Sequence, residues 1–202
     1  MNAFDIVCVT QRAACAEDFC ARLAALAAAG VDRIILREKD LTESESLKLA
    51  EHALTACGDK LTLHHFPGAC SALNVPRLHV SLSQLEHAQE LRQAVEVLGV
   101  SIHAPVEAVR AQELGADYVT AGHVFATDCK RGLPGRGLDF LRQTVQAVSI
   151  PVYAIGGIAA ENIAAVQQTG ASGVCLMSGL MRCPNPESTM QALRRAGCGV
   201  SA

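Results

Sequence analysis

Short apolar runs rich in β-branched residues recur eight times along this chain, and segments of helical length separate them. Since each run is followed by a crossover segment and not by a two-residue hairpin, the pattern predicts parallel strands. The predicted strands are residues 5–10, 33–37, 61–65, 77–80, 97–103, 118–124, 151–155 and 173–177. The predicted helices are residues 16–29, 43–56, 83–94, 105–114, 138–148, 160–169 and 186–196, with one helical turn at 69–74.

Two parallel architectures fit this α/β order, a closed (β/α)8 TIM barrel and an open doubly wound sheet. Eight repeats within 202 residues favour the barrel, because closure removes both sheet edges. An open dinucleotide-binding sheet would also place a glycine-rich G-x-G-x-x-G turn after its first strand, where this chain has Gln11-Arg12-Ala13-Ala14. No linker or low-complexity stretch divides the chain. We therefore expect residues 1–202 to form a single (β/α)8 barrel domain.

Composition narrows the class of protein. Half of the residues are hydrophobic and only 3% are aromatic, which predicts an aliphatic core. The net charge of -3 gives no reason to expect nucleic acid or an anionic membrane as a partner. The nine cysteines are odd in number and include no C-x-x-C pair, and no export signal or membrane-spanning run is visible. The expected protein is cytoplasmic, with reduced thiols.

Glycine-rich turns follow the seventh and eighth predicted strands. Ile155-Gly156-Gly157-Ile158 comes after one, and Met177-Ser178-Gly179-Leu180 comes after the next. In a barrel these loops lie side by side, and glycines let backbone N–H groups approach an anion closely. The alternative is that the glycines only permit tight turns. We predict a phosphate site formed by Gly156, Gly157, Met177, Ser178 and Gly179.

Charged and histidine residues end other strands. Arg37-Glu38-Lys39 follows the second strand and could bind an anionic substrate; alternatively, Arg37 and Glu38 pair and Lys39 is solvated. Ser101 and His103 share one face of the fifth strand, and His123 lies near the end of the sixth. Histidine can exchange a proton with carbon near neutral pH, although a lone strand-end histidine is often structural.

The segment after the sixth strand, residues 126–137, is basic and glycine-rich and carries Thr127, Cys129 and Lys130. Such a loop could cover an anionic ligand. Cys129 could be a nucleophile, but nothing indicates a lowered pKa, so a packing or substrate-lining role is favoured. His64, His65 and His79 could suggest a metal site, yet no carboxylate stands nearby with recognisable ligand spacing. No metal ligands are predicted.

These landmarks together resemble the thiamine phosphate synthase/TenI superfamily over nearly the whole chain. The matching segments are Leu36-Arg37-Glu38-Lys39, Gly99-x-Ser101-x-His103, residues 115–119, the loop from Gly122 to Lys130, residues 151–158 and Met177-Ser178-Gly179. The resemblance implies a barrel of this size, a role in thiamin biosynthesis and a homo-oligomer.

Within that superfamily, the resemblance separates two activities. Synthases join a pyrimidine pyrophosphate to a thiazole phosphate with Mg²⁺, and they typically carry Asn-Asp after the third strand and Gly-Gln-x-Asp after the fourth. This chain has His64-His65-Phe66 and Val80-Ser81-Leu82-Ser83 at those places. Without these acids, protein cations alone would have to neutralise the pyrophosphate, which weakens the synthase interpretation.

The sequence Gly122-His123-Val124-Phe125-x-Thr127-Asp128-Cys129-Lys130 instead resembles TenI-type aromatising thiazole tautomerases, which move a proton within a carboxylated thiazole phosphate. The resemblance implies an isomerase without cofactor, in which His123 moves the proton from a barrel rim opposite the phosphate site. Arg37, Lys39 and Lys130 would face the carboxylate, and Ser101 and His103 would position the ring. The alternatives are a thiamine phosphate synthase, which would need Mg²⁺, and a non-catalytic relative that binds thiazole phosphate.

Overall fold

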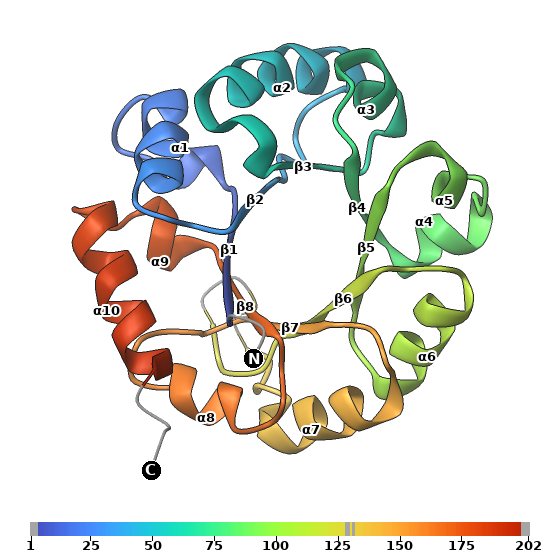
Figure 1. Ribbon diagram of the computed structural model, residues 1–202, viewed down its shortest axis with the longest axis vertical. Helices are drawn as coiled ribbons and strands as arrows, with labels where there is room; N and C mark the ends of the chain where they lie inside the picture. Colours follow the sequence, from blue (N-terminus) through green and yellow to red (C-terminus); the bar gives the residue numbers. More distant parts are fainter. Residues whose placement is uncertain (1–3, 128–129, 131, 199–202) are drawn as a thin grey trace.

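The eight strands form one closed parallel barrel in the computed structural model, which describes residues 4–127, 130 and 132–198 (Figure 1). The strands are β1 (Asp5–Val9), β2 (Arg33–Leu36), β3 (Leu61–His64), β4 (Arg77–Ser81), β5 (Val97–Ile102), β6 (Tyr118–Gly122), β7 (Val152–Ile155) and β8 (Gly173–Leu176). Each strand pairs in parallel with the next, and β8 pairs back with β1. The predicted (β/α)8 barrel is therefore confirmed.

Helices surround the barrel on all sides (Figure 1). They are α1 (Phe19–Ala28), α2 (Glu43–Cys57), α3 (Pro67–Leu73), α4 (Leu82–His87), α5 (Leu91–Ala94), α6 (Pro105–Glu113), α7 (Gly137–Ala147), α8 (Ile163–Gln167), α9 (Ser178–Met181) and α10 (Pro186–Cys198). Two short 3-10 turns, Arg12–Ala14 and Gly58–Lys60, complete the order. The predicted helices therefore exist, with changes at three places.

The predicted helix at residues 83–94 is two short helices. Ala88, with φ of -142°, leaves the helical region and ends α4, so that α5 starts afresh at Leu91. The helix predicted at residues 160–169 begins only at Ile163, because Asn162 uses its side chain to hold the preceding turn. The short helix α9 was not predicted; it follows β8 directly and carries Ser178 and Gly179.

The apolar residues form two separate layers, one on each face of the strands. Alternate residues of β1 show this: Ile6 and Cys8 pack outwards against the helices, whereas Val7 and Val9 pack inside the barrel. Inside the barrel, Val7 and Val9 meet Ile35, Tyr118, Tyr153 and Cys175. Filling the barrel in this way leaves only its ends open to a ligand.

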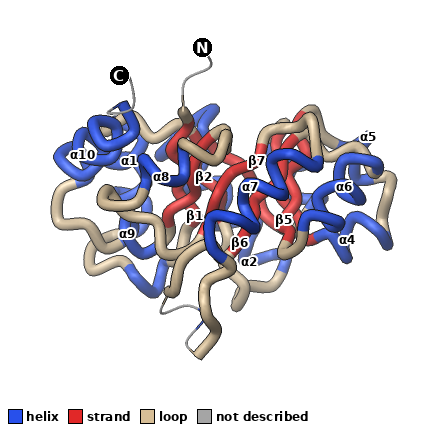
Figure 2. The backbone as a smooth tube through the Cα atoms, turned by 90° about the horizontal axis from the view of Figure 1, so that it is seen from below, coloured by secondary structure: helices blue, strands red, loops and turns tan. Residues whose placement is uncertain are grey.

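The two ends of the barrel differ. Figure 2 shows the start of β1 and the end of α10 at one end, whereas the described part of the connection between β6 and α7 projects from the other. That second end carries the carboxyl ends of the strands, where barrel proteins bind ligands. Over the described part of the chain, no helix combines the length and apolar character required to cross a membrane.

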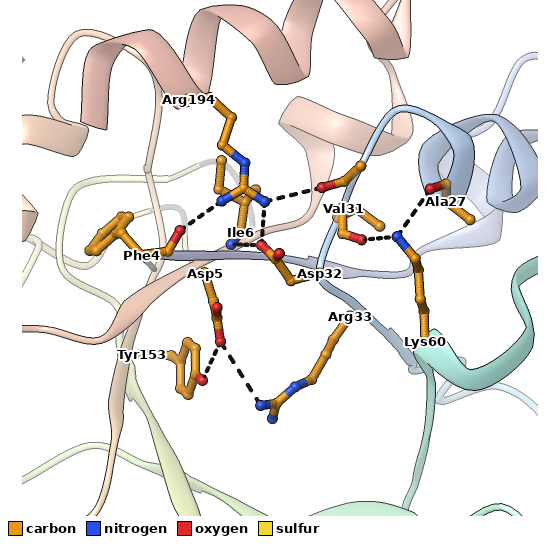
Figure 3. Close-up of polar contacts among 11 residues, drawn as sticks. Phe4, Asp5, Ile6, Ala27, Val31, Asp32, Arg33, Lys60, Tyr153 and Arg194 are labelled. Carbon is orange, nitrogen blue, oxygen red and sulfur yellow. Dashed lines mark hydrogen bonds and ion pairs between the residues drawn. The ribbon is translucent and has the colours of Figure 1, made fainter. Parts of the chain in front are cut away.

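A polar network closes the amino-terminal end (Figure 3). Arg194 of α10 donates to the carbonyl oxygens of Phe4 and Gly30 and forms an ion pair with Asp32. Asp32 in turn accepts the backbone N–H of Ile6 in β1 at 2.6 Å. One guanidinium therefore joins the last helix to the first strand and to the turn before β2.

We expect the change Arg194→Met to lower the free energy of unfolding by about 1–3 kcal/mol, because two carbonyl oxygens and Asp32 lose a charged donor. Urea unfolding followed by circular dichroism measures this loss. The control is Arg195→Met, on the exposed side of the same helix. Equal stability of the two variants would contradict the role given to the network.

Candidate functional site

A pocket of about 650 Å³ opens at the carboxyl ends of the strands. It is large enough for a small phosphorylated metabolite. Apolar side chains such as Ile35, Leu41, Phe66, Ile155 and Ile158 form part of its wall. The polar residues that line it are Arg37, Glu38, Lys39, His64, His65, His79, Ser81, Ser101, His103, Thr120, His123, Thr127, Lys130 and Ser178. Gly156, Gly157, Met177 and Gly179 also line it, so every described residue of the predicted site faces this one pocket.

The glycine loop after β7 is held against the segment after β6. Gly156 and Gly157 have φ angles of +100° and +65°, a region in which side chains are unfavourable. A Cβ atom on Gly157 would also lie 2.5 Å from the carbonyl oxygen of Ala126. Tight packing therefore requires glycine at this position. This supports the structural alternative, a tight turn, as well as the predicted phosphate site.

Backbone donors of the two neighbouring loops remain available to a ligand. Among the described residues, no hydrogen bond uses the N–H groups of Gly157, Ser178 or Gly179. The carbonyl oxygen of Gly157 is engaged, because it accepts the side-chain amide of Asn162 at 2.8 Å. The side of the pocket at β7 and β8 thus offers N–H groups, the chemistry that binds phosphate oxygens.

Cations gather at another side of the pocket. Arg37 and Lys39 follow β2, and Lys130 comes from the connection after β6. The nearby positive charge of Arg37, together with desolvation and Lys130, lowers the pKa of Lys39. Groups whose charges repel in this way would be stabilised by an anion between them. This arrangement fits the predicted contact with a substrate carboxylate.

Glu38 is the only carboxylate among the described residues that line the pocket. It accepts the hydroxyl of Thr10 at 2.7 Å and the backbone N–H of Arg12 at 3.0 Å. These bonds fix the turn after β1 to the turn after β2. Glu38 therefore has a structural role, because its carboxylate holds the two turns together. The sequence did not suggest its contacts with Thr10 and Arg12.

His123 lies immediately after β6, beside the glycine loop. Its carbonyl oxygen accepts the N–H of Arg136, and the guanidinium of Arg136 donates to the carbonyl of Gly122. The next residues, Val124 and Phe125, donate to Ile155 and Gly156. A Cβ atom on Gly156 would lie 2.4 Å from the Cβ atom of His123. The imidazole thus adjoins the glycine wall, and the prediction that it stands opposite that wall is wrong.

The imidazole of His123 is incompletely bonded. Its Nε2 atom is buried and has no hydrogen-bond partner among the described residues. A buried polar atom without a partner is unfavourable unless a ligand or water meets it. Because His123 is one of the residues that line the pocket, this nitrogen is a candidate for contact with a bound ring.

Histidines also form the floor of the pocket. His79 is 3% exposed, and its ring stacks on that of His64 with 5.9 Å between centroids. Burial, reinforced for His64 by the neighbouring His79, lowers the pKa of both histidines to about 3. Both rings are therefore neutral at physiological pH. In the sequence these residues suggested only metal ligands, although the alternation of β4 places His79 inside the barrel.

The remaining predicted residues lie at the rim. His103 follows β5 with its side chain 51% exposed, and its backbone N–H donates to Glu107. Desolvation lowers the pKa of His103 despite this nearby carboxylate. Thr127 lines the pocket. Cys129 lies outside the described residues, so its predicted role stays a prediction.

The residues present do not fit a magnesium site of the kind that the synthase resemblance implies. The two segments expected to carry acids have none: in the first, His65 bonds to Gln84, and in the second, Ser81 caps α4 while Ser83 stands at the position of the acid. No group of three or more potential metal ligands occurs in the described part of the chain. Hard divalent cations need carboxylate oxygens, and Glu38 is already engaged.

The fold and the pocket define a parallel (β/α)8-barrel protein with a small-molecule site at the carboxyl ends of its strands. The model of the thiamine monophosphate synthase family matches residues 6–180. The chain therefore belongs to the thiamine monophosphate synthase/TenI family.

Relatives and solved structures agree with this assignment. Thiamine-phosphate synthase of Thermus thermophilus is 33% identical over 178 residues, covering 86% of each chain. Thiamine-phosphate synthase 2 of Streptococcus pneumoniae is 32% identical over 181 residues, covering 87% of this chain and 86% of the relative. The structure of thiamine phosphate pyrophosphorylase from Pyrococcus furiosus has a TM-score of 0.84 at 25% identity, covering 97% of this chain and 96% of the other. These names support the synthase alternative of the sequence analysis rather than the tautomerase.

Proposed function

We propose that this protein is an aromatising thiazole tautomerase, a cofactor-free isomerase that acts on a carboxylated thiazole phosphate. One observation carries the proposal. The only described carboxylate in the pocket, Glu38, is bonded to Thr10 and Arg12, whereas Nε2 of His123 is buried there without a partner. Such a pocket is suited to moving a proton and poorly suited to holding Mg²⁺.

The proposed binding mode follows from the distribution of donors. Phosphate oxygens accept the free N–H groups of Gly157, Ser178 and Gly179, and Gly156 and Met177 shape the same wall. The carboxylate turns towards Arg37, Lys39 and Lys130, with Thr127 nearby. Ser101 and His103 contact the ring from β5. Because His123 adjoins the phosphate wall, the thiazole ring beside the phosphate arm comes within reach of its imidazole.

His123 performs the proposed proton transfer. Its Nε2 atom takes the proton from the ring carbon and returns a proton to the position that makes the ring aromatic, so that substrate and product have the same atoms. Aromaticity supplies the driving force. The protein contributes the orientation of the substrate and the acid–base group.

Thiamine phosphate synthesis is the second candidate, and the names of the relatives favour it. In that reaction Arg37, Lys39 and Lys130 would have to neutralise the leaving pyrophosphate without the acids that hold a metal. At both metal-binding positions, a synthase with such a site would differ from the synthases that the sequence resembles.

Two parallel assays distinguish the candidates. In the first, purified protein is mixed with the unaromatised thiazole phosphate carboxylate, and the aromatic ring is followed by absorbance. In the second, the protein receives the pyrimidine pyrophosphate, the thiazole phosphate and Mg²⁺, and thiamine phosphate is measured. We expect aromatisation well above the rate without protein and no thiamine phosphate. The opposite pattern would establish the synthase. Binding without either reaction would indicate a non-catalytic relative.

A further inference from the structure

A buried polar pair lies under the floor of the pocket. The hydroxyl of Tyr118 and Nδ1 of His79 are 3.0 Å apart inside the barrel. The chain makes room for them at Gly99, where a Cβ atom would lie 2.3 Å from the Tyr118 hydroxyl and 2.5 Å from His79 Nδ1. Any side chain at position 99 would displace the pair. The sequence thus provides space for this contact, which the proposed proton transfer does not use.

The direction of this hydrogen bond can be argued from Tyr118. Its side chain is buried, with the residue 4% exposed, and burial raises the pKa of the phenol, so the hydroxyl keeps its proton. Among the described residues, His79 Nδ1 is the only hydrogen-bond partner of this hydroxyl. A buried donor without an acceptor is unfavourable by about 1–3 kcal/mol. Tyr118 therefore donates and His79 Nδ1 accepts.

The tautomer of His79 follows. A neutral imidazole carries one proton, and if Nδ1 accepts, the proton is on Nε2. Nε2 lies 2.8 Å from the hydroxyl oxygen of Ser101, so it donates to that oxygen. Thr120 also donates to Ser101, at 3.3 Å. With two donors directed at its oxygen, Ser101 has its own hydrogen free for a partner in the pocket, whose wall it forms.

We infer that Tyr118 and His79 are positioning residues that make Ser101 a dedicated hydrogen-bond donor to an acceptor group of the bound ligand. The identity of that group rests on the proposed function. The phosphate wall is built by β7 and β8; in the closed barrel β6 separates β5 from β7, and β5 is three strands from β8. Ser101 therefore meets the ligand away from the phosphate, at the ring that the proposed binding mode places beside it, and the ring substituent that fits a committed donor is the carboxylate.

The tautomer is tested first, in protein without ligand, by ¹⁵N NMR of the histidine rings. We expect His79 in the wild type to be protonated on Nε2 and unprotonated on Nδ1. The change Tyr118→Phe removes the donor, and the two tautomers should then both be populated. Protonation on Nδ1 in the wild type would overturn the inference, because Ser101 would then donate to His79 and not to a ligand.

Ligand affinity is tested by calorimetry with two probes, the aromatic carboxylated thiazole phosphate and the same compound without its carboxylate. We expect Ser101→Ala to lower the affinity for the carboxylated probe about tenfold, the equivalent of one lost hydrogen bond to a charged group. Tyr118→Phe should lower the same affinity several-fold. Both changes should alter the affinity of the second probe less than twofold. Ser101→Thr keeps the hydroxyl and should retain most of the affinity.

The matched control is Tyr153→Phe, which removes another hydroxyl inside the barrel, bonded to Asp5 at the amino-terminal end (Figure 3). It should leave both affinities unchanged. Equal weakening of the two probes by Ser101→Ala would contradict the inference. If Tyr118→Phe does not fold, the tautomer of His79 in the wild type and the affinities of Ser101→Ala are sufficient to test the inference. If the wild type binds neither probe, the proposed function fails, while the NMR result still reports on the tautomer.

Discussion

Replacing His123 by glutamine should lower the rate of aromatisation by about 10²–10⁴-fold, the usual contribution of a positioned acid–base group. Glutamine keeps polarity and approximate size, but it cannot take a proton from carbon. Since the phosphate and carboxylate contacts come from other residues, the affinity for the aromatic product should change less than threefold. Steady-state absorbance kinetics and calorimetry measure the two quantities separately.

The control for this substitution is His52→Gln, on an exposed position of α2 that does not line the pocket. It should retain the wild-type rate. A His123→Gln protein that also keeps the wild-type rate would show that another group moves the proton. Loss of product binding together with activity would instead indicate that His123 shapes the pocket.

Acidification should destabilise the protein through its buried histidines. The pKa of His79 is lowered to about 3 in the folded protein, below the ordinary value of 6.5, because the ring is desolvated. Between these values the unfolded chain binds a proton that the folded protein does not, so stability is complete above pH 6.5 and is lost as the pH falls towards 3. At pH 4.5 the expected loss from His79 is about 3 kcal/mol.

Carboxylates titrate in the same range, so the effect is isolated by comparison with His79→Asn. The free energy of unfolding in urea is measured for both proteins at pH 7.5 and pH 4.5. The advantage of the wild type over the variant should shrink by about 3 kcal/mol on acidification. His52→Asn, an exposed control, should show no such change. A constant difference between wild type and His79→Asn would mean that His79 is not buried in its neutral form.

Periodic patterns were sufficient to predict the architecture. Eight apolar runs with crossovers define a barrel, and residues at strand ends then share one rim by topology. For this reason Arg37, Ser101, His123 and Gly156, far apart in sequence, could be assigned to a common pocket from the sequence alone. The ends of the helices were predicted less accurately, because nothing in the apolar pattern indicates that Ala88 leaves the helical region. The predicted homo-oligomer stays a prediction.

The pairing of side chains across strands could not be predicted in the same way. Glu38 is bonded to Thr10 and Arg12, and the sequence separation of 26 to 28 residues hides such contacts. The pair of Tyr118 and His79 depends on the register of β4, β5 and β6, which places Gly99 between them. A glycine inside a strand signals a close approach, but the partners become evident only from the register.

The most direct test of the proposed site is a crystal structure of the protein with the aromatic carboxylated thiazole phosphate. The proposal predicts phosphate oxygens within hydrogen-bonding distance of the N–H groups of Gly157, Ser178 and Gly179, and Nε2 of His123 in contact with the ring. A phosphate bound instead among Arg37, Lys39 and Lys130, with the ring away from His123, would contradict it.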